Sequence, residues 1–144
     1  MRRTSAKPQN RLVKVLIVEE NRAMCGLVRA LVEGLPVAIS ECRNGSQALA
    51  VCREVQPDWI LIDLDLAGTD ALAATRQIAL LYPHSRILLL SEDDNPKLRD
   101  IATKAGVWAI VLKESLIDVR RFLEPSADDP ETREWKTVPE GEIQ

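Results

Sequence analysis

Four short apolar runs, each followed by a polar residue, constrain the fold of this chain more than any other feature. They are residues 15–18 before Glu19, 59–62 before Asp63, 87–90 before Ser91 and 107–112 before Lys113. An apolar run of this length without alternation is typical of a strand buried on both faces, as in a parallel sheet. A fifth segment, residues 37–42, is more mixed and fits an edge strand.

Between these runs, apolar residues recur at the spacing of amphipathic helices. The expected helices cover residues 24–32, 48–55 (opening near Gly45), 72–81 (capped near Asp70 and ended by Pro83), 95–106 and 116–123. The pattern predicts that Leu27, Leu81 and Ile101, each in a different helix, point toward the core. Asn95-Pro96 is a helix start, and Gly106 is a helix stop.

Strand and helix therefore alternate five times, which predicts an α/β fold with a doubly wound, five-stranded parallel sheet. The expected strand order is 2-1-3-4-5, as in flavodoxin-like folds. We expect one domain over residues 14–123, a basic N-terminal arm over 1–13 and an acidic, proline-containing tail or linker over 124–144. Trp135 in that tail is either an exposed aromatic residue or an anchor that docks on some surface, and one helical turn is expected after Asp129-Pro130.

Composition excludes several classes of protein. No apolar run approaches the roughly 18 residues that span a bilayer. Cys25, Cys42 and Cys52 form no CxxC pair and indicate free thiols, which suits a reducing cytoplasm. With one histidine, His84, a zinc site or a Ser-His-Asp triad is disfavoured, and a net charge of −3 gives no reason to expect direct nucleic-acid binding.

The polar residues after the strands indicate phosphoryl chemistry. In an open parallel sheet, ligands bind beyond the carboxyl ends of the strands, so Glu19-Glu20, Asp63, Ser91 and Lys113 are expected in one crevice. Clustered carboxylates favour Mg²⁺, a hard cation with oxygen ligands. A carboxylate beside that cation can attack a phosphoryl group, while a lysine and a hydroxyl hold the new phosphoryl oxygens.

Residues 15–21, 58–70, 87–91 and 104–113 together resemble the receiver (CheY-like) domain of two-component response regulators. The resemblance implies that Asp63 is the phosphoacceptor, that Ser91 follows the phosphoryl group on activation and that Lys113 pairs with it. Glu19 and Glu20 stand at the family's acidic pair. They would bind Mg²⁺ together with Asp63 and the backbone carbonyl of Asp65.

The resemblance further implies a switch rather than an enzyme, at most self-phosphorylating and self-dephosphorylating. A sensor histidine kinase or a histidine phosphotransfer protein would donate the phosphoryl group in the cytoplasm. The face of the fourth helix, fifth strand and fifth helix would rearrange and could form a homodimer, with Leu98, Ile101 and Ile110 available.

Two alternatives stay open. Glu20, Glu92 and Ile110 depart from the family pattern, which fits a receiver-like interaction module that phosphorylation does not regulate. Asp63-Leu64-Asp65 also resembles the DxD motif of haloacid-dehalogenase phosphohydrolases, in which Asp65 would be the acid/base.

Overall fold

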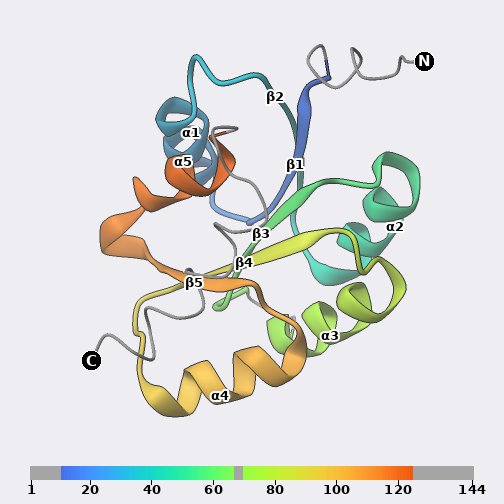
Figure 1. Cartoon of the computed structure of the whole chain (residues 1–144), viewed down its shortest axis with the longest axis vertical. Coiled ribbons are helices and arrows are strands. Elements are labelled where there is room, and N and C mark those ends of the chain that lie inside the picture. Colours follow the sequence, from blue (N-terminus) through green and yellow to red (C-terminus); the bar gives the residue numbers. More distant parts are fainter. Residues whose placement is uncertain (1–10, 67–69, 125–144) are drawn as a thin grey trace, which may run out of the picture.

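A computed structural model, which describes residues 11–66 and 70–124, shows a five-stranded parallel sheet with helices on both faces (Figure 1). The strand order is β2-β1-β3-β4-β5, and every neighbouring pair is parallel. The predicted fold class and strand order are therefore confirmed. The strands are β1 (Val13–Val18), β2 (Val37–Cys42), β3 (Trp59–Asp63), β4 (Arg86–Ser91) and β5 (Ala109–Leu112).

The helices lie in two groups around this sheet. They are α1 (Arg22–Leu31), α2 (Gly45–Val55), α3 (Ala71–Leu81), α4 (Pro96–Ala105) and α5 (Asp118–Leu123). Helices α1 and α5 cover one face, while α2, α3 and α4 lie on the other side (Figure 1). A short 3-10 helix, η2 (Lys113–Ser115), follows β5, so α5 begins later than the expected residue 116.

Two apolar cores account for the unbroken apolar runs. Val15, Ile17 and Leu61 pack under α1 and α5, whereas Leu16 and Ile60 pack on the opposite face of the sheet with α2 and α3. Successive side chains of a strand point to opposite faces, so a strand covered on both sides must be apolar at every position.

Helix caps explain where the helices begin. The side chains of Asn21, Asn44, Asp70 and Asn95 each accept a hydrogen bond from the backbone N–H three residues later. Each bond satisfies an N–H that the first helical turn leaves without an intrahelical partner. The expected starts at Asp70 and at Asn95-Pro96 are confirmed, and Gly106 ends α4 in a left-handed conformation as predicted.

Three residues expected in the core lie instead at the surface. Leu27 is 47% exposed, Leu81 60% and Ile101 40%. Helix α1 turns Cys25 and Val28 inward, and α4 buries only Ala102 and Ala105. In α1 and α4 the buried face is narrower than the apolar pattern of the sequence, which leaves Leu27 and Ile101 exposed. Leu81 is exposed at the end of its helix, because it is the last residue of α3.

The other boundaries shift by a few residues. Strand β5 begins at Ala109 rather than at residue 107. The preceding Trp108 packs edge to face on Trp59, with ring centroids 6.2 Å apart. Cys25, Cys42 and Cys52 are free thiols, as predicted, and all three are buried.

Some expectations concern residues outside the described ranges. The helical turn after Asp129-Pro130 and the position of Trp135 are among them, and the division into arm, domain and tail stays a prediction. None of the helices in the described ranges is both long and apolar enough to cross a membrane.

Gly106 gives a test of how α4 approaches α3. Its φ is +97°, and an added Cβ would lie 2.5 Å from the Cβ of Ala79 in α3. We expect Gly106→Ala to lower the free energy of unfolding by about 3 kcal/mol, because backbone strain adds to steric overlap. Urea unfolding followed by circular dichroism measures this loss.

Gly34 is the matched control. Its φ is +89°, but nothing lies within 4 Å of an added Cβ. Gly34→Ala should therefore cost only the backbone strain, about 1 kcal/mol. Equal losses in the two variants would contradict the close packing of Gly106 on Ala79.

Candidate functional site

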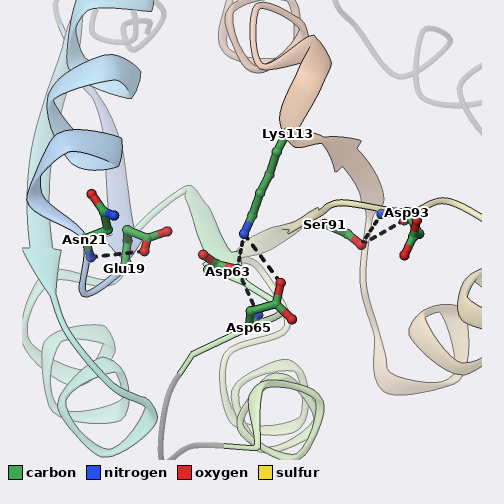
Figure 2. A network of polar contacts seen from close by, with 7 residues as sticks. All are labelled: Glu19, Asn21, Asp63, Asp65, Ser91, Asp93 and Lys113. Atoms are coloured by element: carbon green, nitrogen blue, oxygen red, sulfur yellow. Dashed lines mark hydrogen bonds and ion pairs between the residues drawn. The ribbon is translucent and has the colours of Figure 1, made fainter.

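The carboxyl ends of three strands bring together the charged residues predicted from the sequence (Figure 2). Asp63 is the last residue of β3, while Glu19 and Lys113 directly follow β1 and β5. Each stands two positions after a residue of the core under α1 and α5, namely Leu61, Ile17 and Val111. The alternation of a strand therefore directs the three side chains toward the same side of the sheet.

The Asp63 carboxylate is the centre of this site. It is 5% exposed, and its Oδ1 lies 2.9 Å from the Lys113 Nζ. The same oxygen accepts a hydrogen bond of 2.8 Å from the backbone N–H of Asp65. Lys113 Nζ also lies 3.5 Å from Oδ2 of Asp65, so one ammonium group serves two carboxylates.

These contacts set the charge states of the ion pair. Burial by itself raises the pKa of Asp63, but the neighbouring Glu19 carboxyl group and the hydrogen bond from the Asp65 backbone N–H favour the charged form. With Lys113 added, the pKa of Asp63 stays below its usual range. Burial disfavours the Lys113 ammonium, yet the hydrogen bond and charge of Asp63 outweigh burial and raise the pKa of Lys113. The pair is therefore ionised at neutral pH.

Glu19 behaves differently although it lies beside the same carboxylate. Burial, followed by the interaction with the Asp63 carboxyl, raises the pKa of Glu19 from 4.5 to about 7. The backbone N–H of Asn21 opposes this shift by donating to Oε2 at 3.1 Å. Oε1 is buried and accepts no hydrogen bond from any donor in the described ranges. Glu19 and Asp63 therefore resist being charged together.

Ser91 lies at the same edge of the sheet, but its hydroxyl is turned toward the following loop (Figure 2). Its Oγ donates to the backbone carbonyl of Asp93 at 2.8 Å and accepts from the Asp93 N–H at 3.1 Å. Ser91 follows Leu90, which belongs to the core under α1 and α5. Because successive side chains of a strand point to opposite faces, the Ser91 side chain points to the other face of the sheet. The structure thus places Ser91 near the crevice without a contact to Asp63.

The acidic pair is also divided. Glu19 is buried, whereas Glu20 is exposed. Within residues 11–66 and 70–124, no three His, Cys, Asp or Glu side chains are arranged to hold a metal ion. The three carboxylates of Glu19, Glu20 and Asp63 therefore do not converge as a single ligand set.

The donor set nevertheless suits Mg²⁺. This cation keeps several water ligands and is commonly held by only one or two carboxylates. The buried Glu19 Oε1, which lacks a donor, and the Asp63 carboxylate supply two such oxygens. A cation would also favour the charged form of Glu19, which the site otherwise disfavours.

Three backbone contacts at this site were not predicted from the sequence. The N–H of Asn21 holds Glu19, the N–H of Asp65 holds Asp63, and the Asp93 backbone holds the Ser91 hydroxyl. Asn21 carried a usable signal, because an asparagine before an apolar helical pattern predicts a cap and thus a turn at that point. The Ser91 turn carries no comparable signal.

The raised pKa of Glu19 predicts a pH dependence of stability. Between about pH 5 and pH 7 the folded protein holds a proton that the unfolded chain has released, so the free energy of unfolding falls as pH rises. Glu19→Gln removes the titrating carboxyl group and therefore removes this loss of stability. In buffers with EDTA, the stability of the variant relative to wild type should rise by roughly 2 kcal/mol from pH 5 to pH 8.

Urea unfolding at a series of pH values measures this difference. Glu114→Gln makes the same substitution at an exposed side chain and should run parallel to wild type. If Glu19→Gln also ran parallel to wild type, Glu19 would not retain a proton in the folded protein.

Comparison with known proteins identifies the family of this chain. The response regulator receiver domain model matches residues 15–122. The chain is 29% identical over 107 residues to the transcriptional regulatory protein LiaR of Bacillus subtilis, covering 72% of this chain and 50% of LiaR. It is 28% identical over 101 residues to the transcriptional regulatory protein ZraR of Salmonella typhimurium, covering 70% of this chain and 23% of ZraR. The chain thus spans half or less of these relatives.

Solved structures share the fold. The phosphorylated cyanobacterial phytochrome response regulator RcpA aligns with a TM-score of 0.71 at 20% identity, covering 82% of this chain and 98% of RcpA. The chemotaxis response regulator CheY4 of Vibrio cholerae aligns with a TM-score of 0.70 at 18% identity, covering 78% of this chain and 99% of CheY4. Because the family model matches most of the chain and the sheet has the same order, this chain belongs to the family of response regulator receiver domains.

Proposed function

We propose that this receiver domain is a phosphorylation switch in which Asp63 accepts a phosphoryl group. The observation that carries the proposal is the Asp63 carboxylate, buried and ionised, with Lys113 Nζ 2.9 Å from its Oδ1. A sensor histidine kinase or a histidine phosphotransfer protein is the donor. The switch changes what the domain binds, and it turns over no substrate beyond its own phosphoryl group.

The transfer step follows from the contacts of Asp63. Lys113 and the Asp65 N–H both hold Oδ1, so Oδ2 is the oxygen that attacks. A bond forms between Oδ2 and phosphorus while the bond from phosphorus to the donor imidazole nitrogen breaks, and the electron pair stays on that nitrogen. Lys113 then offsets the charge of the phosphoryl oxygens.

Mg²⁺ would be held by Glu19, Asp63 and the backbone carbonyl of Asp65, and the exposed Glu20 would have to turn toward them to become a further ligand. When bound, the cation would offset negative charge on the carboxylates and on the phosphoryl group. The Asn21 N–H keeps the Glu19 carboxylate oriented in the crevice.

The conformational response would pass through Ser91. To reach a phosphoryl group, its hydroxyl must leave both hydrogen bonds with Asp93. This release loosens the turn before α4, and α4 is held by few buried side chains. The face of α4, β5 and α5, where Ile101 is exposed, is the proposed output surface and the surface for a homodimer.

The cellular setting is part of the same proposal. Three buried free thiols suit a reducing cytoplasm. The relatives named as transcriptional regulators are at least twice as long as the matched region, so any contact with nucleic acid need not involve residues 14–123. The absence of direct nucleic-acid binding by this domain stays a prediction.

One observation favours a second candidate, an interaction module that phosphorylation does not regulate. The Ser91 hydroxyl is already satisfied by Asp93, and the three residues that follow Ser91, 92–94, are all acidic and exposed, which disfavours the approach of an anionic donor from that side. The phosphohydrolase alternative has no such support, because the matching family is that of receivers.

Phosphoryl acceptance separates these candidates. The protein is incubated with Mg²⁺ and a small-molecule phosphodonor, and intact mass is recorded. We expect one phosphoryl group per chain in wild type, none in Asp63→Asn and none in wild type with excess EDTA. Asp100→Asn is the matched control, since it makes the same change on the exposed surface of α4 and should accept normally.

Two results would contradict the proposal. Equal acceptance by Asp63→Asn would place the acceptor elsewhere. No acceptance by wild type from small donors or from a histidine phosphotransfer protein would favour the unregulated interaction module.

A further inference from the structure

A pocket lies at the opposite end of the sheet from Asp63. Its volume is about 310 Å³. It is lined by the first residues of three strands, Val13 of β1, Trp59 of β3 and Arg86 of β4, and by the end of α5. The phosphoacceptor site lies at the carboxyl ends of the same strands, so this pocket has no part in the chemistry proposed above.

Aromatic rings and a guanidinium group form one wall of the pocket. The ring centroids of Trp59 and Phe122 are 5.8 Å apart. The Arg86 guanidinium lies 5.2 Å from the ring centroid of Trp59 and 5.0 Å from that of Trp108, which does not itself line the pocket. Such a wall suits another aromatic side chain, because aromatic rings pack edge to face and a guanidinium group is attracted to the face of a ring.

Both ends of the described domain border this pocket. Arg11 and Leu12 line it, and so does Glu124. The side chains of residues 1–11 carry a net charge of +4, whereas those of residues 125–144 carry −4. Segments of opposite charge therefore leave the domain next to the same cavity.

We propose that the acidic segment 125–144 folds back on the domain and seats Trp135 in this pocket. Trp135 is the one aromatic residue of the sequence outside the described ranges. It follows Glu124 by 11 residues, which span up to about 37 Å when extended and are enough to turn back to a pocket that Glu124 itself lines. The pocket lining offers such an acidic segment the cations of Arg11 and Arg86, beside the carboxylates of Asp58 and Glu124.

Attachment to the domain makes weak contacts sufficient. A short tether gives an effective concentration in the millimolar range. Burial of the indole ring, a ring contact, a cation–π contact and the attraction between the two charged segments together then favour the docked state. Docking weakens with added salt, because exposed charges are screened.

Fluorine NMR of the full chain labelled with 5-fluorotryptophan tests this docking. The signal of Trp135 is identified by its absence in Trp135→Phe. We expect a soluble paramagnetic chelate to broaden that signal weakly in wild type and strongly in Arg86→Glu. Arg53→Glu is the matched control, because it makes the same charge change on the exposed face of α2 and should resemble wild type.

Proteolysis gives an independent readout. Lys136 follows Trp135 directly, so docking shields the bond after Lys136 from trypsin. Cleavage there should be about threefold faster in Arg86→Glu than in wild type, because cleavage follows the undocked fraction. Arg53→Glu should again match wild type.

The reciprocal variant excludes a general effect of Arg86→Glu on folding. Trp135→Ala changes only the segment, yet it should shift the fluorine signals of Trp59 and Trp108. The proposal is overturned if neither signal moves, if the chelate broadens Trp135 equally in wild type and Arg86→Glu, or if protection of Trp135 depends on protein concentration. The last result would mean that the segment docks on a second copy of the chain.

Discussion

The ion pair between Lys113 and Asp63 organises the carboxyl edge of the sheet. It joins the end of β5 to the end of β3 across the intervening β4, over 2.9 Å and largely away from water. A buried carboxylate without a cation would be costly, and so would a half-buried lysine without an anion. The site is therefore stable only when both strands end at this edge, which makes the local charge arrangement depend on the strand order.

Glu19 supplies a second buried carboxyl group beside Asp63. Lys113 offsets the charge of Asp63, so Glu19 remains as a buried acid that resists ionisation beside it. The Glu19 carboxyl can hold a proton, or it can stay charged beside a bound cation. Either state changes how much negative charge surrounds Asp63. A phosphorylation switch with a divalent cation is consistent with that property.

The two ends of the sheet differ because parallel strands differ at their two ends. The carboxyl ends carry the charged crevice, whereas the amino ends carry Trp59 and Arg86 against the end of α5. The first arrangement suits phosphoryl chemistry, and the second suits an aromatic side chain. Separation by the length of the strands lets each end be altered without direct contact with the other.

The apolar runs and the residues that follow them were sufficient to predict the fold and the grouping of the charged residues. Two-sided apolar runs such as residues 59–62 require a covered parallel sheet, and the carboxyl ends of parallel strands share one edge, so Glu19, Asp63 and Lys113 had to lie close together. Tertiary structure alone decided the exposure of Ile101 and the direction of the Ser91 hydroxyl. Packing between helix and sheet determines how much of an apolar helix face is buried, and periodicity does not predict that width. The geometry of a short turn determines which backbone groups a hydroxyl bonds, and residue type does not predict that geometry.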